Sequence, residues 1–119
     1  MTRKQEEISE LLRREISSII LHELSDPRTG FVTVTHVRIA GDYQSARVFV
    51  TVRGSEEDLR RTLKALTHAR GHIQSLIARR IKLRHTPVLE FVEDRDVRKA
   101  QRVDRLIDKV TEQETGPES

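Results

Sequence analysis

The sequence predicts a single α+β domain in which amphipathic helices cover a small sheet. Three segments carry apolar residues at every third or fourth position, the period of a helix with one buried face. Short runs rich in β-branched residues, typical of strands, lie between them. The 119 residues suffice for one modest core and contain no internal repeat. We expect residues 1–110 to form this domain and residues 111–119, which lack apolar side chains, to be a disordered tail.

The first helix is expected over residues 3–24. Thr2 is a suitable N-cap, and Pro27 ends the helix because proline disfavours helical backbone at the residue before it. The side chains predicted to form the apolar face of this helix are Ile8, Leu11, Leu12, Ile16, Ile19, Ile20 and Leu24.

Two strands joined by a glycine-containing turn are expected next, as an antiparallel hairpin. In the strand 31–40, the apolar alternation changes parity between Val34 and Val37. A bulge at Thr35 or His36 would restore the alternation, whereas a strand covered on both faces would need no bulge. The second strand alternates without interruption. One face carries Ala46, Val48, Val50 and Val52, and the other carries Arg47, Phe49, Thr51 and Arg53.

A second helical region begins after Ser55, an N-cap whose following acids suit the positive end of the helix dipole. Gly71 interrupts the apolar stripe, so either one long helix tolerates the glycine or two helices meet there. The stripe consists of Leu59, Leu63, Leu66, Ile73, Leu76, Ile77 and Ile81. A third strand is expected over residues 88–92, and a last helix after the N-cap Asp96. That helix would bury Val97, Val103, Leu106, Ile107 and Val110.

The positive charge of the chain is concentrated in residues 59–89. The net charge is only +3, but this block holds eight basic side chains and no acidic one: Arg60, Arg61, Lys64, Arg70, Arg79, Arg80, Lys82 and Arg84. Because no acid is interleaved, ion pairs along the same helix cannot neutralise them. Three roles are open to these side chains: they form a solvated face, they pair with acids elsewhere such as Asp94 or Asp104, or they bind a polyanion. We favour the polyanion, since mixed charges would serve solubility equally well.

No catalytic, metal or cofactor site is predicted. The chain has no cysteine, and its glycines are too far apart for a phosphate-binding loop. His68 and His72 are four residues apart, but Ala69 stands where the zinc-protease motif needs glutamate. Ordinary turn and edge roles are expected for the carboxylates Asp42, Glu90 and Asp94. Without a signal or membrane-spanning segment, the expected location is the cytoplasm.

Aromatic side chains are scarce, and only Phe49 falls on the polar face of a predicted strand. Modules that stack bases on a sheet need several exposed rings. We therefore expect RNA to be recognised through phosphates and shape rather than through base stacking.

Three segments resemble the ribosome-binding factor A family of bacterial small-subunit maturation factors: Ala-Leu-Thr-His-Ala-Arg-Gly-His-Ile at residues 65–73, Asp-Pro-Arg at 26–28, and residues 83–91. The resemblance implies a type II KH-like fold, α-β-β-α-(kink)-α-β with an additional C-terminal helix, whose helices pack on one face of a three-stranded sheet. It also implies that an Ala69-Arg70-Gly71 kink replaces the backbone-clamping Gly-x-x-Gly loop of other KH domains.

The resemblance further implies a non-enzymatic monomer that binds 16S rRNA on the immature or free 30S subunit. Its role would be late maturation, including 16S rRNA 5′-end processing, notably in the cold, without cofactor, membrane or small-molecule substrate. The expected RNA-binding residues are Ala69, Arg70, Gly71, His72, Gln74, Arg79, Arg80, Lys82 and Arg84, with the patch extended by Arg38, Arg47 and Arg53. The alternatives are an adaptor whose basic face docks on an acidic protein and, third, a DNA-binding protein.

Overall fold

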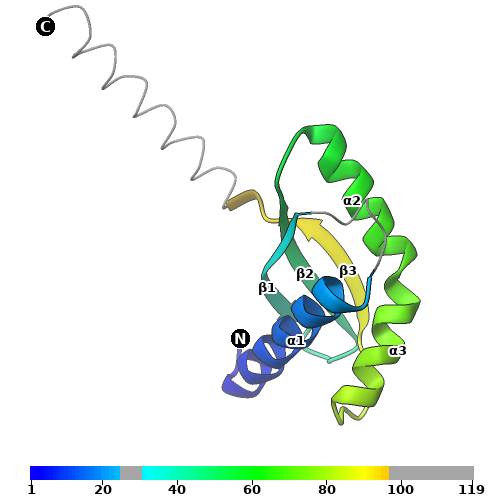
Figure 1. Ribbon diagram of the computed structural model, residues 1–119. Coiled ribbons are helices and arrows are strands. Elements are labelled where there is room, and N and C mark those ends of the chain that lie inside the picture. Colours follow the sequence, from blue (N-terminus) through cyan, green and yellow to red (C-terminus); the bar gives the residue numbers. More distant parts are fainter. Residues whose placement is uncertain (25–30, 97–119) are drawn as a thin grey trace, which may run out of the picture.

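The computed structural model describes residues 1–24 and 31–96 (Figure 1). Several predicted features lie outside these residues: the break at Pro27, the last helix after Asp96, the domain boundary at residue 110 and the tail over residues 111–119. The described elements are α1 (Arg3–His22), β1 (Val32–Ile39), β2 (Ser45–Val52), α2 (Glu56–His68), α3 (Arg70–Arg80) and β3 (Val88–Glu93).

The strands form one mixed sheet in the order β1-β2-β3. β1 and β2 form the predicted antiparallel hairpin, and β3 lies parallel to β2 on the other side, which the chain reaches through α2 and α3. The helices pack on one face of this sheet, with α1 across β1 and with α2 and α3 beside β3 (Figure 1). No helix of the described part of the chain covers the other face, called here the open face.

A β-bulge lies where the sequence predicts it. The register between β1 and β2 shifts between Val34 and His36, which leaves Thr35 as the extra residue. Val34 and Val37 therefore both face the core, while His36 faces outward and is exposed. The alternative of a strand buried on both faces does not occur.

The core lies between the sheet and the three helices. It contains most of the predicted apolar residues of the hairpin, though not Val52, and most of the helical stripes. The members with no exposed surface are Leu12, Ile16, Ile19, Val48, Val50, Leu66, Ile73, Ile77 and Leu89. Leu11 was expected in the core but is 40% exposed. It lies at the edge of the α1 stripe, because a step of one residue turns the helix by about 100° from Leu12.

The predicted N-caps Thr2 and Ser55 are confirmed, and each forms a capping box. The Thr2 hydroxyl accepts a hydrogen bond from the Gln5 N–H, and the Gln5 side chain accepts one from the Thr2 N–H. Ser55 and Asp58 make the same reciprocal pair at the start of α2. Each box satisfies backbone donors that the first helical turn leaves free.

The question left open at Gly71 is resolved in favour of two helices, visible as a change of direction in Figure 1. The junction is Ala69, two residues before the glycine. Hydrogen bonds continue on both sides of it, from the Ala69 N–H to the Ala65 carbonyl and from the Ile73 N–H to the Ala69 carbonyl, each 3.0 Å. Gly71 therefore lies in the first turn of α3.

Candidate nucleic-acid interface

Four cationic side chains on α3 and the loop after it are exposed and unpaired. Arg70 stands at the start of α3, Arg79 in its last turn, and Lys82 and Arg84 in the loop that follows. None of the four makes an ion pair with any residue that the structure describes. The end of α3 and the loop thus present uncompensated positive charge, which suits a polyanion.

Two arginines of the block are neutralised within the protein, which corrects the expectation drawn from the sequence. Arg61 lies 2.9 Å from Glu57, one turn earlier in α2 and just outside the acid-free block. Arg80 lies 3.0 Å from Glu23 and 3.6 Å from Glu15 of α1, and its side chain is only 30% exposed. Arg80 therefore joins α3 to the α1 segment through two ion pairs.

The kink exposes its backbone. Arg70, Gly71 and His72 are all exposed, and a Cβ added at Gly71 would have no atom within 4 Å. Ala69 is partly buried and packs against the core. A backbone that is open on one side and anchored on the other allows close approach of a ligand.

Gln74 does not belong to this exposed set. Its Oε1 accepts a hydrogen bond of 3.0 Å from the Leu89 N–H, and the residue is partly buried. This contact joins α3 to the first residues of β3. The amide therefore helps to position the helix on the sheet.

Lys82, Arg84 and His85 line a groove of about 610 Å³ together with Lys4 of α1 and Tyr43 of the β1–β2 turn. The Lys4 ammonium lies 5.9 Å from the centre of the Tyr43 ring, within the range of a cation–π contact. Two segments that are distant in the chain, the start of α1 and the loop after α3, thus bring basic groups to one place beside Tyr43. The sequence did not indicate Lys4 as part of this group, because no local pattern shows that the start of α1 lies beside the loop after α3.

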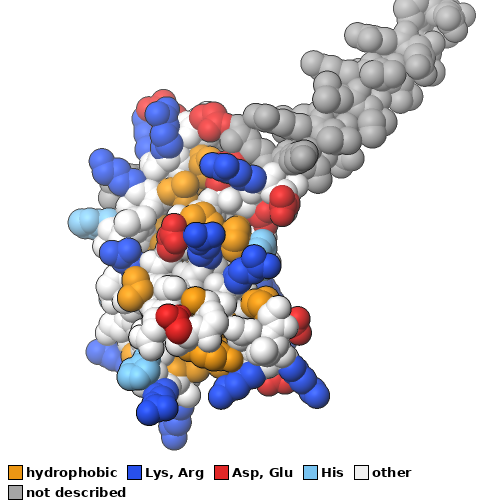
Figure 2. Space-filling view, turned by 180° about the vertical axis from the view of Figure 1, so that it is seen from behind, with side chains coloured by type: hydrophobic (Ala, Val, Ile, Leu, Met, Phe, Trp, Pro, Cys, Tyr) orange, Lys and Arg blue, Asp and Glu red, His pale blue; other side chains and the backbone are white. Residues whose placement is uncertain are grey.

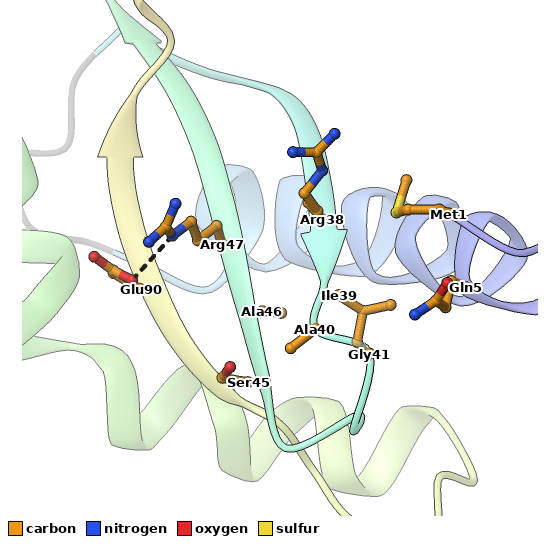
Figure 3. A pocket seen from close by; sticks show the side chains of 10 residues that line it. All are labelled: Met1, Gln5, Arg38, Ile39, Ala40, Gly41, Ser45, Ala46, Arg47 and Glu90. Atoms are coloured by element: carbon orange, nitrogen blue, oxygen red, sulfur yellow. Dashed lines mark ion pairs between the residues drawn. The ribbon is translucent and has the colours of Figure 1, made fainter.

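Arg38, Arg47 and Arg53 lie on the other side of the sheet. Arg38 and Arg47 are directly opposed across β1 and β2, and the Arg47 Nε is 3.4 Å from a Glu90 oxygen (Figure 3). Both side chains line a pocket of about 490 Å³, together with Met1 and Gln5 of the α1 segment (Figure 3). The three arginines therefore lie apart from the α3 patch that the sequence predicted they would extend. Figure 2 shows this side of the molecule, where basic side chains lie among acidic and apolar ones.

The chain is matched by the family model of ribosome-binding factor A over residues 4–107. It belongs to the ribosome-binding factor A family. A ribosome-binding factor A from Halothermothrix orenii is 42% identical over 107 residues, which cover 90% of this chain and 88% of that protein. The resemblance noted in the three sequence segments is confirmed.

Solved structures of the family share the fold. The crystal structure of ribosome-binding factor A from Thermus thermophilus is similar with a TM-score of 0.69 and 32% identity, over 76% of this chain and 97% of that one. A homology model of Thermus thermophilus ribosome-binding factor A has been fitted into a cryo-EM map of its complex with the 30S subunit. It is similar with a TM-score of 0.62 and 32% identity, over 74% of this chain and 92% of that one. The α+β, KH-like type II class is therefore confirmed for the described elements.

In this member of the ribosome-binding factor A family, the open face carries a ring pair that the sequence did not indicate. His36 stacks on Phe49 with centroids 4.1 Å apart and an angle of 14° between the rings. The His36 Nδ1 also lies 3.4 Å from the carboxylate of Asp94. Asp94, expected to be an ordinary edge residue, is 3% exposed and accepts a hydrogen bond from the Thr35 hydroxyl.

The described residues contain no group of three or more metal-ligating side chains, including around His68 and His72. Within the same ranges, 1–24 and 31–96, no helix combines the length and apolar content needed to cross a bilayer.

Proposed function

We propose that this member of the ribosome-binding factor A family binds the 30S ribosomal subunit by contacting 16S rRNA and acts there without a chemical step. It would act on the immature or free subunit, as a cytoplasmic monomer, in late maturation that includes 16S rRNA 5′-end processing and is most needed in the cold. Family membership and the 30S complex of the Thermus thermophilus relative support the partner. The observation that carries the proposal is the unpaired set Arg70, Arg79, Lys82 and Arg84.

Phosphates are the natural ligands of such a set. Each cationic side chain that meets a phosphate releases condensed counterions from the RNA, which favours binding at low salt. Phosphate contacts position a protein without reading base sequence, so specificity would come from the shape of the folded rRNA. Gly71 and its exposed neighbours would let the backbone approach the RNA closely, while Arg80 and Gln74 hold α3 in place from behind.

The test is the salt dependence of binding. Arg79→Ala should weaken binding to purified 30S subunits and to 16S rRNA fragments, and lower the magnitude of the salt slope by about 0.7–0.9. Arg61→Ala is the matched control, because Arg61 is exposed on the adjacent helix but already paired with Glu57. It should leave the slope unchanged.

Equal slopes for the wild-type protein and Arg79→Ala would refute the assignment of this surface. Competition separates the alternatives. Free rRNA fragments should displace the protein from subunits. If an acidic ribosomal protein displaces it from the subunits and free rRNA fragments do not, the chain is an adaptor that docks on protein. Preference for duplex DNA over rRNA in a gel shift would instead indicate a DNA-binding protein.

A further inference from the structure

The open face of the sheet is ordered in cross-strand rows. His36, Phe49 and Val92 form one row across β1, β2 and β3. Arg38, Arg47 and Glu90 form the next row, two residues along each strand and therefore about 7 Å away. The row with the two rings, called here the aromatic row, thus lies beside the row with the two arginines, called the cationic row, on a surface that no described helix covers.

The rings are held in place rather than merely exposed. The bulge at Thr35 turns His36 to the open face, where its side chain is 50% exposed. The Thr35 hydroxyl contacts both the Asp94 carboxylate and the Phe49 carbonyl, so the bulge is tied to β2 and to the end of β3. The Asp94 carboxylate holds the Nδ1 edge of the His36 imidazole, and the Phe49 ring stacks on one face of it. Its other side remains available for a planar ligand.

The cationic row contains an arrangement that the fold itself does not require. Like charges directly opposed on two strands destabilise a sheet, yet Arg38 and Arg47 are such a pair. Glu90 compensates Arg47 alone, and Arg38 has no ion pair with a residue in the described ranges. An anion bound between the guanidinium groups would relieve this repulsion.

The far end of the β1–β2 hairpin repeats the combination of a ring with a cation. Phe31 precedes β1 and is 74% exposed, and its carbonyl accepts a hydrogen bond of 3.1 Å from the Arg53 N–H. Arg53 is exposed and likewise unpaired within the described chain. Thr33 and Thr51, which are opposed across β1 and β2, lie between the two ends.

We propose that the open face is a second RNA-binding surface, specific for unpaired nucleotides, on which a base stacks against His36 over Phe49 and neighbouring phosphates bind Arg38, Arg47 and Arg53. The surface differs in kind from that of α3, which would bind the backbone of folded RNA. The proposal rests on the proposed function in taking RNA as the ligand. It also revises the expectation, drawn from Phe49 alone, that base stacking is disfavoured.

The experiment uses the full chain and a hexameric single-stranded oligoadenylate with 2-aminopurine at its centre. Stacking should quench the 2-aminopurine fluorescence of the bound oligomer. Phe49→Leu keeps apolar bulk in place of the half-buried ring, and His36→Gln keeps a polar group beside Asp94. Each should abolish the quenching and weaken binding by roughly 5- to 150-fold, the range for loss of one base–aromatic stack. An abasic centre in the oligomer should cause a similar loss.

Leu21→Ala is the matched control, because Leu21 is an apolar side chain on α1 with 75% exposure, away from the open face. It should change neither binding nor quenching. Circular dichroism melts of all the variants must show that they are folded. Failure of His36→Gln and a folded Phe49→Leu to alter either readout, or equal affinity for the abasic oligomer, overturns the stacking proposal.

Binding of 30S subunits, measured in parallel with Arg79→Ala, keeps the two proposals distinct. If Arg79→Ala weakens subunit binding while the oligomer experiment fails, the proposed function stands and the open-face surface is wrong. If ring protons of His36 and Phe49 shift in NMR spectra on addition of an acidic protein but not of the oligomer, the face binds protein and the proposal is equally wrong.

Discussion

The Thr35 hydroxyl donates a hydrogen bond to the carboxylate of Asp94, although the two residues are 59 positions apart in the chain. Asp94 also accepts a bond from the Asp96 N–H, and its own N–H donates to the Val50 carbonyl. This buried carboxylate therefore joins the bulge of β1 to the end of β3 across the intervening strand.

Removing that carboxylate should destabilise the domain. Asp94→Ala removes the acceptor of two part-buried hydrogen bonds, from the Thr35 hydroxyl and the Asp96 N–H, which together should cost about 1–3 kcal/mol of unfolding free energy. Asp94→Asn keeps an acceptor and should cost less. Urea unfolding measures both, with Glu90→Gln as the control, because Glu90 is an exposed carboxylate of the same sheet. A loss no larger than that of the control would show that Asp94 does not hold the bulge.

Gly71→Ala should change stability and binding in opposite directions. An alanine at this helical position meets no neighbouring atom, and it should stabilise the protein by about 0.5–1 kcal/mol because glycine loses more backbone entropy on folding. Its methyl group would obstruct close approach of RNA to the backbone, so affinity for 30S subunits should fall. Thermal unfolding and subunit binding of the same preparation check both parts. Unchanged affinity would contradict a backbone contact at the kink.

Arg79 and Arg80 are adjacent in sequence, but their substitutions should have different consequences. Arg80→Ala removes two ion pairs to acids of the α1 segment and should lower the unfolding free energy by about 0.2–1 kcal/mol, with little effect on the salt slope of RNA binding. Arg79→Ala should lower the slope and leave the unfolding free energy nearly unchanged. Urea unfolding and binding titrations at several salt concentrations distinguish them. The reverse assignment of effects would show that the ion pairs of Arg80 do not persist in solution.

Position 54 should tolerate no residue other than glycine. Its φ is +128°, and a Cβ there would collide with the Asp58 carboxylate that caps α2. Gly54→Ala should lower the unfolding free energy by about 1–3 kcal/mol through backbone strain and loss of the cap. Gly41→Ala is the control, since the nearest atom to an added Cβ is in the Gln5 side chain at 3.7 Å. Equal losses would argue against strain at Gly54.

The carboxylate of Glu10 should titrate far below other glutamates. Its hydrogen bonds from Arg13, of 2.6 and 2.8 Å, lower its pKa from 4.5 to about 2. Because the pKa is lower in the folded state, the stabilisation is present above pH 4.5 and is lost as the pH falls towards 2. An NMR titration of the side-chain carboxyl measures the midpoint. Arg13→Ala should return it towards 4.5, and a wild-type midpoint near 4.5 would contradict the pair.

Much of this fold is local and could be predicted from the sequence. The capping residues Thr2 and Ser55 and the strand alternation each depend on neighbours within a few positions. Even the bulge at Thr35 follows from the change of parity between Val34 and Val37. A core face must be continuous, so a strand with one covered side can bury both valines only by inserting a residue.

The sequence by itself also determined that positive charge is concentrated in one block and that the chain resembles its family. Tertiary structure decided which of those charges remain free. Arg80 is neutralised by Glu15 and Glu23, while Arg79 beside it has no ion pair within residues 1–24 and 31–96. Likewise, His36 meets Phe49 and Asp94 only because β2 lies between β1 and β3. These contacts join residues far apart in the chain, and helical or strand periodicity carries no information about which distant residues become neighbours.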